Sequence, residues 1–132
     1  MASMTAALRD RLKAAGPVAA IVGERVYRTV RVQGDGLPAV VITRVSPGRA
    51  YTMRGAIRLH GSRVRIDALG RSAAEVEQLG DVLIASIEPA ETVGEIGFSR
   101  SFLQFDRDLS EQNQTAFDHR RSLEFIIWWW AI

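Results

Sequence analysis

The stretch GSRVRIDALGRSAAEVEQLGDVLIASIEP, residues 61–89, contains the two clearest elements of the chain. Its first part alternates apolar and charged residues, which is typical of a β-strand with one solvent-exposed face. Ser72 followed by Glu75 is a capping box, and the apolar residues after it recur at helical spacing until Pro89. We therefore predict a strand that leads directly into an amphipathic helix. The apolar strand positions are Val64, Ile66 and Ala68, the exposed ones are Arg63, Arg65 and Asp67, and the helix stripe is Val76, Leu79, Leu83 and Ile87.

Further elements flank this pair on both sides. The segment 47–61 holds several glycines and arginines, and we expect a loop or loose hairpin arm there because connections of this length are usually functional or disordered. The closing segment from Phe117 alternates apolar and polar residues and predicts a final strand, antiparallel to the strand before it. The other predicted elements are a helix over 4–15, a helical turn over 18–22, an edge strand over 24–32, a central strand within 37–46 and a strand within 91–108.

This order, α-β-β-loop-β-α-β-β, predicts an α+β fold. We expect a mainly antiparallel sheet with helices packed on one face. With 132 residues, the chain fits a single domain over 1–132.

Charge is distributed unevenly along the chain. Residues 1–71 hold 13 basic and 4 acidic residues, whereas residues 72–132 hold 4 basic and 11 acidic ones. One interpretation is that the halves interleave and neutralise each other within one molecule. The other is a subunit with oppositely charged surfaces, which favours head-to-tail association. A nucleic-acid-binding module that uses the basic N-terminal half is an alternative function.

No recognised catalytic or metal-binding motif is found in the sequence. His60 and His119 are isolated from other ligand-type residues, and Asp106 and Asp108 lack a third ligand in a metal-binding pattern. Phosphate-binding glycine loops and nucleophile elbows are absent as well. We therefore predict that the protein is not an enzyme and holds no cofactor or metal. Asp106, Arg107 and Asp108 suggest instead a charged strand edge or a site of salt bridges between subunits.

The chain ends in the apolar sequence LEFIIWWWAI, residues 123–132. Its uninterrupted apolar run is eight residues long, whereas a membrane-spanning helix needs about 20, so no membrane contact is expected. On the final strand one side can enter the core, which leaves Trp128 and Trp130 on the other side. We predict that these two indoles pack on a neighbouring subunit or tail protein, and the alternative is that they pack within their own subunit.

Several stretches together resemble a known family. They are GERVY at 23–27, LPAVVITRVS at 37–46, the strand and helix at 61–83, and FLQFDRD with the closing strand that ends in tryptophan. In this order they resemble the tail completion, or tail terminator, proteins of long-tailed bacteriophages and gene transfer agents. The three consecutive tryptophans depart from the single terminal aromatic residue expected for that family.

The resemblance implies a structural virion protein that is assembled in the bacterial cytoplasm. Such a protein would form a ring with itself, generally a hexamer, which caps the tail tube, ends its polymerisation and joins it to the head connector or stopper protein. DNA would pass through the lumen without specific binding. For the contacts with neighbouring subunits or tail proteins we predict Arg49, Tyr51, Arg54, Arg58, Asp106, Arg107, Asp108, Trp128 and Trp130.

Overall fold

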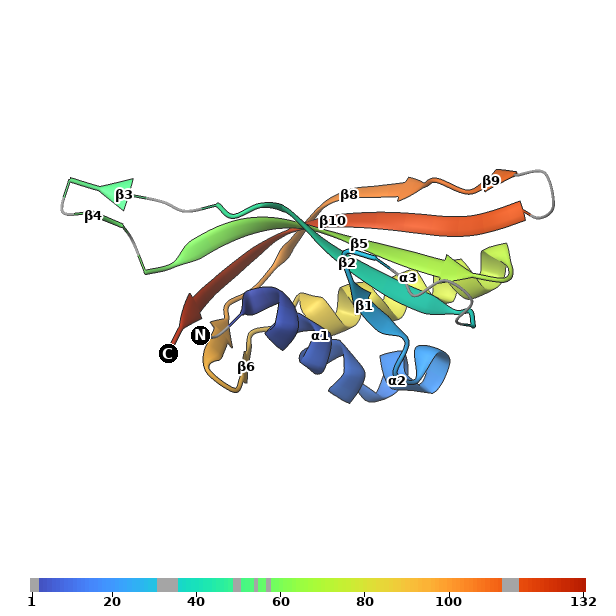
Figure 1. Cartoon of the computed structure of the whole chain (residues 1–132), viewed down its shortest axis with the longest axis horizontal. Coiled ribbons are helices and arrows are strands. Elements are labelled where there is room, and N and C mark those ends of the chain that lie inside the picture. The colour runs from blue at the N-terminus through green and yellow to red at the C-terminus, as the bar shows by residue number, and fades with distance from the viewer. Residues whose placement is uncertain (1–2, 31–35, 49–50, 54, 57, 113–116) are drawn as a thin grey trace.

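The computed structural model places all three helices against one face of a curled β-sheet (Figure 1). It describes residues 3–30, 36–48, 51–53, 55–56, 58–112 and 117–132. The helices are α1 (Met4–Ala14), α2 (Gly16–Val22) and α3 (Ala73–Ile87). The strands are β1 (Val26–Arg28), β2 (Ala39–Ser46), β3 (Tyr51–Thr52), β4 (Gly55–Ala56), β5 (His60–Gly70), β6 (Glu91–Val93), β7 (Ile96–Phe98), β8 (Phe102–Asp108), β9 (Glu111–Gln112) and β10 (Phe117–Ala131).

Strand β10 organises the sheet. It runs antiparallel to β5 over 11 residue pairs, and on its other side it pairs first with β9 and β8 and then with β7. Beyond β5 the sheet continues with antiparallel β2 and then with β1, which is parallel to β2. The predicted α+β fold, with a mainly antiparallel sheet and helices on one face, is confirmed.

The core lies between the helices and the inner face of the sheet. Leu123, Phe125 and Ile127 of β10 are fully buried there, as their alternation predicts. They meet the apolar stripes of α1 and α3, and such burial contributes about 1.5–3 kcal/mol for each large side chain. The inner face of β5 contributes Val64, Ile66 and Ala68, and α3 contributes Val76, Leu79, Leu83 and Ile87.

The start of α3 shows the predicted capping box with a small shift. The Ser72 hydroxyl accepts a hydrogen bond from the Glu75 amide at 3.2 Å. The Glu75 carboxylate reaches back one residue further than in the usual box and accepts from the Arg71 amide at 2.9 Å. The Arg71 guanidinium in turn donates to the Leu37 carbonyl, so the cap also ties α3 to the beginning of β2.

Two local expectations were wrong. The strand expected over 24–32 has only three described strand residues, because Thr29 turns the chain with a φ of 69°. The strand expected within 91–108 is divided into the hairpin β6–β7, which turns at Gly94, and the separate strand β8. The expectation of a loop or loose hairpin arm over 47–61 is confirmed in its hairpin form, since the described residues there include the small hairpin β3–β4, which projects from the sheet (Figure 1).

Asp67 is a third wrong expectation, since the alternation of β5 predicts an exposed side chain there. Its side chain is only 1% exposed. The Arg120 guanidinium donates to Asp67 Oδ2 at 2.7 Å, and Arg65 Nε lies 3.3 Å from the same oxygen. Both arginines contact Oδ2 and offset part of the cost of burying the carboxylate, whose Oδ1 has no hydrogen-bond partner among the described residues.

Candidate functional site

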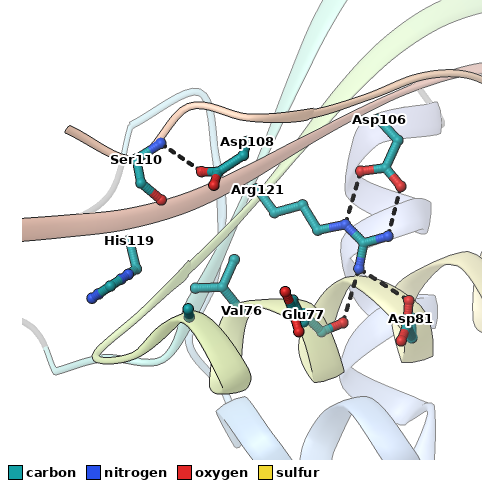
Figure 2. Close-up of a pocket in the computed structure, with 9 residues that line it drawn as sticks. Val76, Glu77, Asp81, Asp106, Asp108, Ser110, His119 and Arg121 are labelled. Atoms are coloured by element: carbon teal, nitrogen blue, oxygen red, sulfur yellow. Dashed lines mark hydrogen bonds and ion pairs between the residues drawn. The ribbon is translucent and has the colours of Figure 1, made fainter.

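A cavity of about 600 Å³ lies between α3 and the strands β8 and β10 (Figure 2). Four carboxylates and one arginine line it, together with Ala73, Val76, Ser110 and His119. We call it the acidic cavity. Its charged lining residues are Glu77, Asp81, Asp106, Asp108 and Arg121.

Arg121 joins three parts of the fold at the end of this cavity. Its Nε and Nη2 atoms donate to both carboxylate oxygens of Asp106, at 2.8 and 2.6 Å. Its Nη1 donates to the Glu77 carbonyl and to Asp81, at 2.9 and 3.0 Å. Gly80 of α3 makes this approach possible, because a Cβ atom there would lie 2.5 Å from Arg121 Nη1.

These charge-assisted bonds shift the titration of both partners. The hydrogen bonds from Arg121 lower the pKa of Asp106 below its usual range, against a smaller effect of burial. The same bonds raise the pKa of Arg121, so its charge is fixed. Asp108 also has a lowered pKa, mainly because its carboxylate accepts hydrogen bonds from Ser110. Both aspartates are therefore anionic at neutral pH.

The acidic cavity thus carries four carboxylates against the one guanidinium of Arg121. Figure 2 shows the two aspartates of β8 pointing toward the same cavity. Within the described part of the chain, no three His, Asp or Glu side chains are arranged to hold a metal ion. The arrangement favours contact with cationic groups.

A second hollow, of about 410 Å³, lies where α1 meets β1. Arg9, Arg28 and Thr5 line it with the end of β1, and we call it the basic hollow. Arg9 Nε is buried without a hydrogen-bond partner among the described residues, and the Asp10 carboxylate lies 4.0 Å from it. Thr29 at its margin adopts a left-handed backbone conformation that is strained for a β-branched residue.

The uneven charge of the two halves is partly neutralised inside the molecule. Arg11 is almost fully buried and pairs with Glu91 at 2.7 Å, and Arg63 pairs with Glu124 at 3.0 Å. Each of these pairs joins the basic half to the acidic half. Arg25 donates to the Pro38 carbonyl. Part of the opposite charge of the two halves is therefore neutralised within the molecule.

The two predicted contact tryptophans lie on the face of the sheet opposite the helices. Trp128 packs over Gly61 of β5, where a Cβ atom would lie 2.7 Å from the indole ring. Trp130 packs in the same way over Gly97 of β7. Both side chains are half-buried. Trp129 points the other way, packs against the core, and donates from Nε1 to Ser62 at 2.8 Å.

The remaining predicted contact residues are spread over two regions. Arg58 lies at the base of the β3–β4 arm, where its guanidinium donates twice to the Ala131 carbonyl, at 3.1 and 2.8 Å. Tyr51 belongs to β3, while Arg49 and Arg54 lie outside the described residues. Arg107 is exposed on β8, with its guanidinium 4.6 Å from the centre of the Phe105 ring.

Sequence reasoning brought Asp106 and Asp108 together but missed their surroundings. The alternation of the last strand places Arg121 on the same side as the core residue Leu123. It gives no indication that Arg121 binds Asp81 of α3, which is 40 residues earlier in the chain. The basic hollow was missed as well. Gly80 lies within the otherwise regular helical pattern of α3. A glycine inside a helix indicates that another group can pack close to the helix backbone at that position.

Comparison with known proteins adds the decisive observation. The family model described as "Tail completion protein gp17" matches residues 6–129, which is nearly the whole chain. The chain belongs to this family. A similar fold is found in a chain of a solved structure titled "Virion of native gene transfer agent (GTA) particle". The match has a TM-score of 0.75 at 17% identity and covers 98% of this chain and 96% of the other. No curated protein sequence matches the chain.

As a tail completion protein, the chain is a structural component of a phage-type tail, and its place is in the particle. The resemblance predicted from the sequence is confirmed. Among the described residues, no helix has the length and apolar character needed to span a bilayer.

Proposed function

We propose that this tail completion protein assembles with itself into a closed ring, with six subunits, at the end of a tail tube. The ring covers the exposed end of the tube, stops the addition of further tube subunits, and provides the surface on which the head connector or stopper protein docks. The family match over residues 6–129 is the observation that supports this proposal most strongly.

The charge distribution fits the same function. A closed ring of identical subunits needs two different lateral surfaces on each subunit, one complementary to the other. The acidic cavity lies beside β8 and β10, whereas the basic hollow lies beside β1, at the far end of the strand order. The role requires binding surfaces and no catalytic group. DNA passes through the lumen of such a ring without being held by specific contacts.

The termination role predicts a defect in tube length. Particles produced without this protein should have tails of uncontrolled length that are not joined to heads, and supplying the chain should restore both properties. Electron microscopy of such particles measures tail length directly. Tails of normal length and normal attachment in its absence would contradict the proposed function. Tight binding of the purified chain to DNA at physiological salt would favour the alternative of a nucleic-acid-binding module.

The tryptophan end is proposed as part of the contact with a neighbouring subunit or tail protein, together with Arg58 and the β3–β4 arm. Replacing both Trp128 and Trp130 by serine should therefore weaken assembly, because half-buried tryptophans contribute strongly when an interface covers them. Light scattering compares assembly, and circular dichroism verifies that the variant is folded. A folded variant that assembles like the parent would rule out this contact.

A further inference from the structure

Several strands of the sheet have sides that no described strand covers, and the sides of β8 and of the β1–β2 end stand out by the side chains that they carry. Among the described residues, β8 pairs with β10 alone, so its outer side presents backbone groups to solvent. At the other end of the strand order, β1 covers β2 only as far as Ile42. Beyond Ile42, β2 pairs with β5 on one side as far as Ser46, and on its other side it has no described strand partner. Exposed strand edges of this kind are templates for pairing with another chain.

The β8 edge carries apolar and acidic side chains. Phe102 and Phe105 are 53% and 42% exposed, which is unusual for phenylalanine. Asp106 and Asp108 lie on the helix-bearing side of the strand, since they are in register with Leu123 and Arg121 of β10. The edge therefore combines aromatic surface with the acidic cavity.

The β1–β2 edge carries the matching features. Val45 of β2 is 52% exposed, and Val30, just beyond β1, is 71% exposed. Arg44 and Arg28 are exposed and lie on the helix-bearing side, because their register partners are Val64 and Ile42 of the core. The basic hollow adjoins the same edge and is lined by Arg9 and Arg28.

We propose that these two edges are the two halves of the contact between subunits, so that β8 of one copy extends the sheet beside the β1–β2 edge of the next. This inference rests on the proposed ring. In a sheet continued from copy to copy with all helices on the same side, the carboxylates of β8 meet the arginines of β1 and β2 on that side. The exposed phenylalanines and valines then cover each other.

A second copy of this chain is the partner that fits best. Both edges belong to the same molecule, carry opposite charges on the same face of the sheet, and lie apart in the strand order, which is the geometry of a heterologous contact. Backbone pairing between edge strands supplies affinity, and the charges fix which edge meets which.

Cross-linking tests the contact directly, because the chain has no cysteine. Two variants, Val45→Cys and Phe105→Cys, each place one thiol at an exposed position on one edge. When the two are mixed and oxidised, a covalent dimer should form, whereas either variant alone should form much less of it. Gln104→Cys replaces Phe105→Cys if the phenylalanine is needed for folding. Failure to obtain the mixed dimer at any protein concentration would overturn the proposal.

Reversing the charge on one edge at a time distinguishes the proposed edge contact from the proposed ring. Asp108→Arg or Arg44→Asp should each raise the protein concentration needed for half-assembly about tenfold or more. The control Glu88→Arg, at an exposed position at the C-terminal end of α3, should assemble like the parent. A mixture of the two edge variants should assemble better than either variant alone, because the reversed charge on one edge attracts the reversed charge on the other. If the parent forms rings and both edge variants also do, the ring stands and the edge contact is wrong. If the parent forms no ring, the proposed function itself fails.

Discussion

At the scale of single residues, glycines determine how closely the strands and side chains approach one another. Gly48 follows β2 with a φ of 62°, and a Cβ atom there would collide with the backbone carbonyl of Gly61. Gly61 itself provides the flat surface on which Trp128 lies. The tryptophan end and the base of the β3–β4 arm therefore depend on the same pair of glycines.

Substituting Gly48 by alanine should lower the free energy of unfolding by about 2 kcal/mol or more. About 1 kcal/mol comes from the left-handed backbone conformation, and the rest comes from the clash with the Gly61 backbone, which cannot rotate away. Urea denaturation of the purified variant measures the change.

The matched control is Gly16→Ala, at the start of α2, where an added Cβ atom would have no neighbour within 4 Å and φ is not positive. This variant should be as stable as the parent or slightly more so. Equal stability of the Gly48 and Gly16 variants would contradict the close approach of the two backbones.

At the scale of elements, Arg121 fastens α3 to the outer part of the sheet. Helix α3 contributes the Glu77 carbonyl and Asp81, β8 contributes Asp106, and β10 carries the arginine. Strand β8 has β10 as its described strand partner, so this ion-pair network is a second attachment that holds β8 in place. Because the network fixes β8 relative to α3, it also determines the position of the acidic cavity between them.

The network predicts a defined dependence of stability on pH. Hydrogen bonds from Arg121 lower the pKa of Asp106 in the folded protein below its ordinary 3.8. A carboxylate with a lowered folded pKa stabilises the protein fully above the ordinary value, and this contribution is lost as the pH falls below 3.8 through the folded pKa. Acidification below this value should therefore weaken the attachment of β8.

Asp106→Asn should accordingly destabilise the protein by about 0.5–1 kcal/mol at neutral pH, because the pair is partly exposed to solvent. The difference from the parent should shrink when unfolding is measured well below the ordinary carboxyl pKa. Asp10→Asn, at an exposed position on α1, is the control and should change stability little. A constant difference at all pH values would show that Asp106 acts through packing alone.

At the scale of the whole molecule, local patterns predicted the layers but not the contacts between distant segments. The alternation at Val64, Ile66 and Ala68 depends only on neighbouring residues, so it indicated the strand and its buried face. The burial of Asp67 depends on Arg120, 53 residues away, and the pattern could not contain that information. The same is true of the packing of Trp128 over Gly61.

As with the fold, the sequence predicted those features of the charged surfaces that depend on neighbouring residues. The sequence indicated the uneven charge and the charged strand edge at Asp106 and Asp108, since both can be read from the order of residues along the chain. Which arginines are neutralised internally depends on the fold, because Arg11 and Arg63 find their partners 80 and 61 residues along the chain. The opposed positions of the acidic cavity and the basic hollow follow from strand order, which charge counts do not determine.

The mass of the purified protein in solution, over a range of concentrations, shows most directly whether the chain assembles into a ring with itself. Native mass spectrometry resolves each assembled species as a multiple of the 14.6 kDa chain. A subunit built to close a ring with itself should give one dominant species of six copies, with partial assemblies only at low concentration and high salt. A monomer at every concentration, alone and in the presence of tail tubes, would contradict the account.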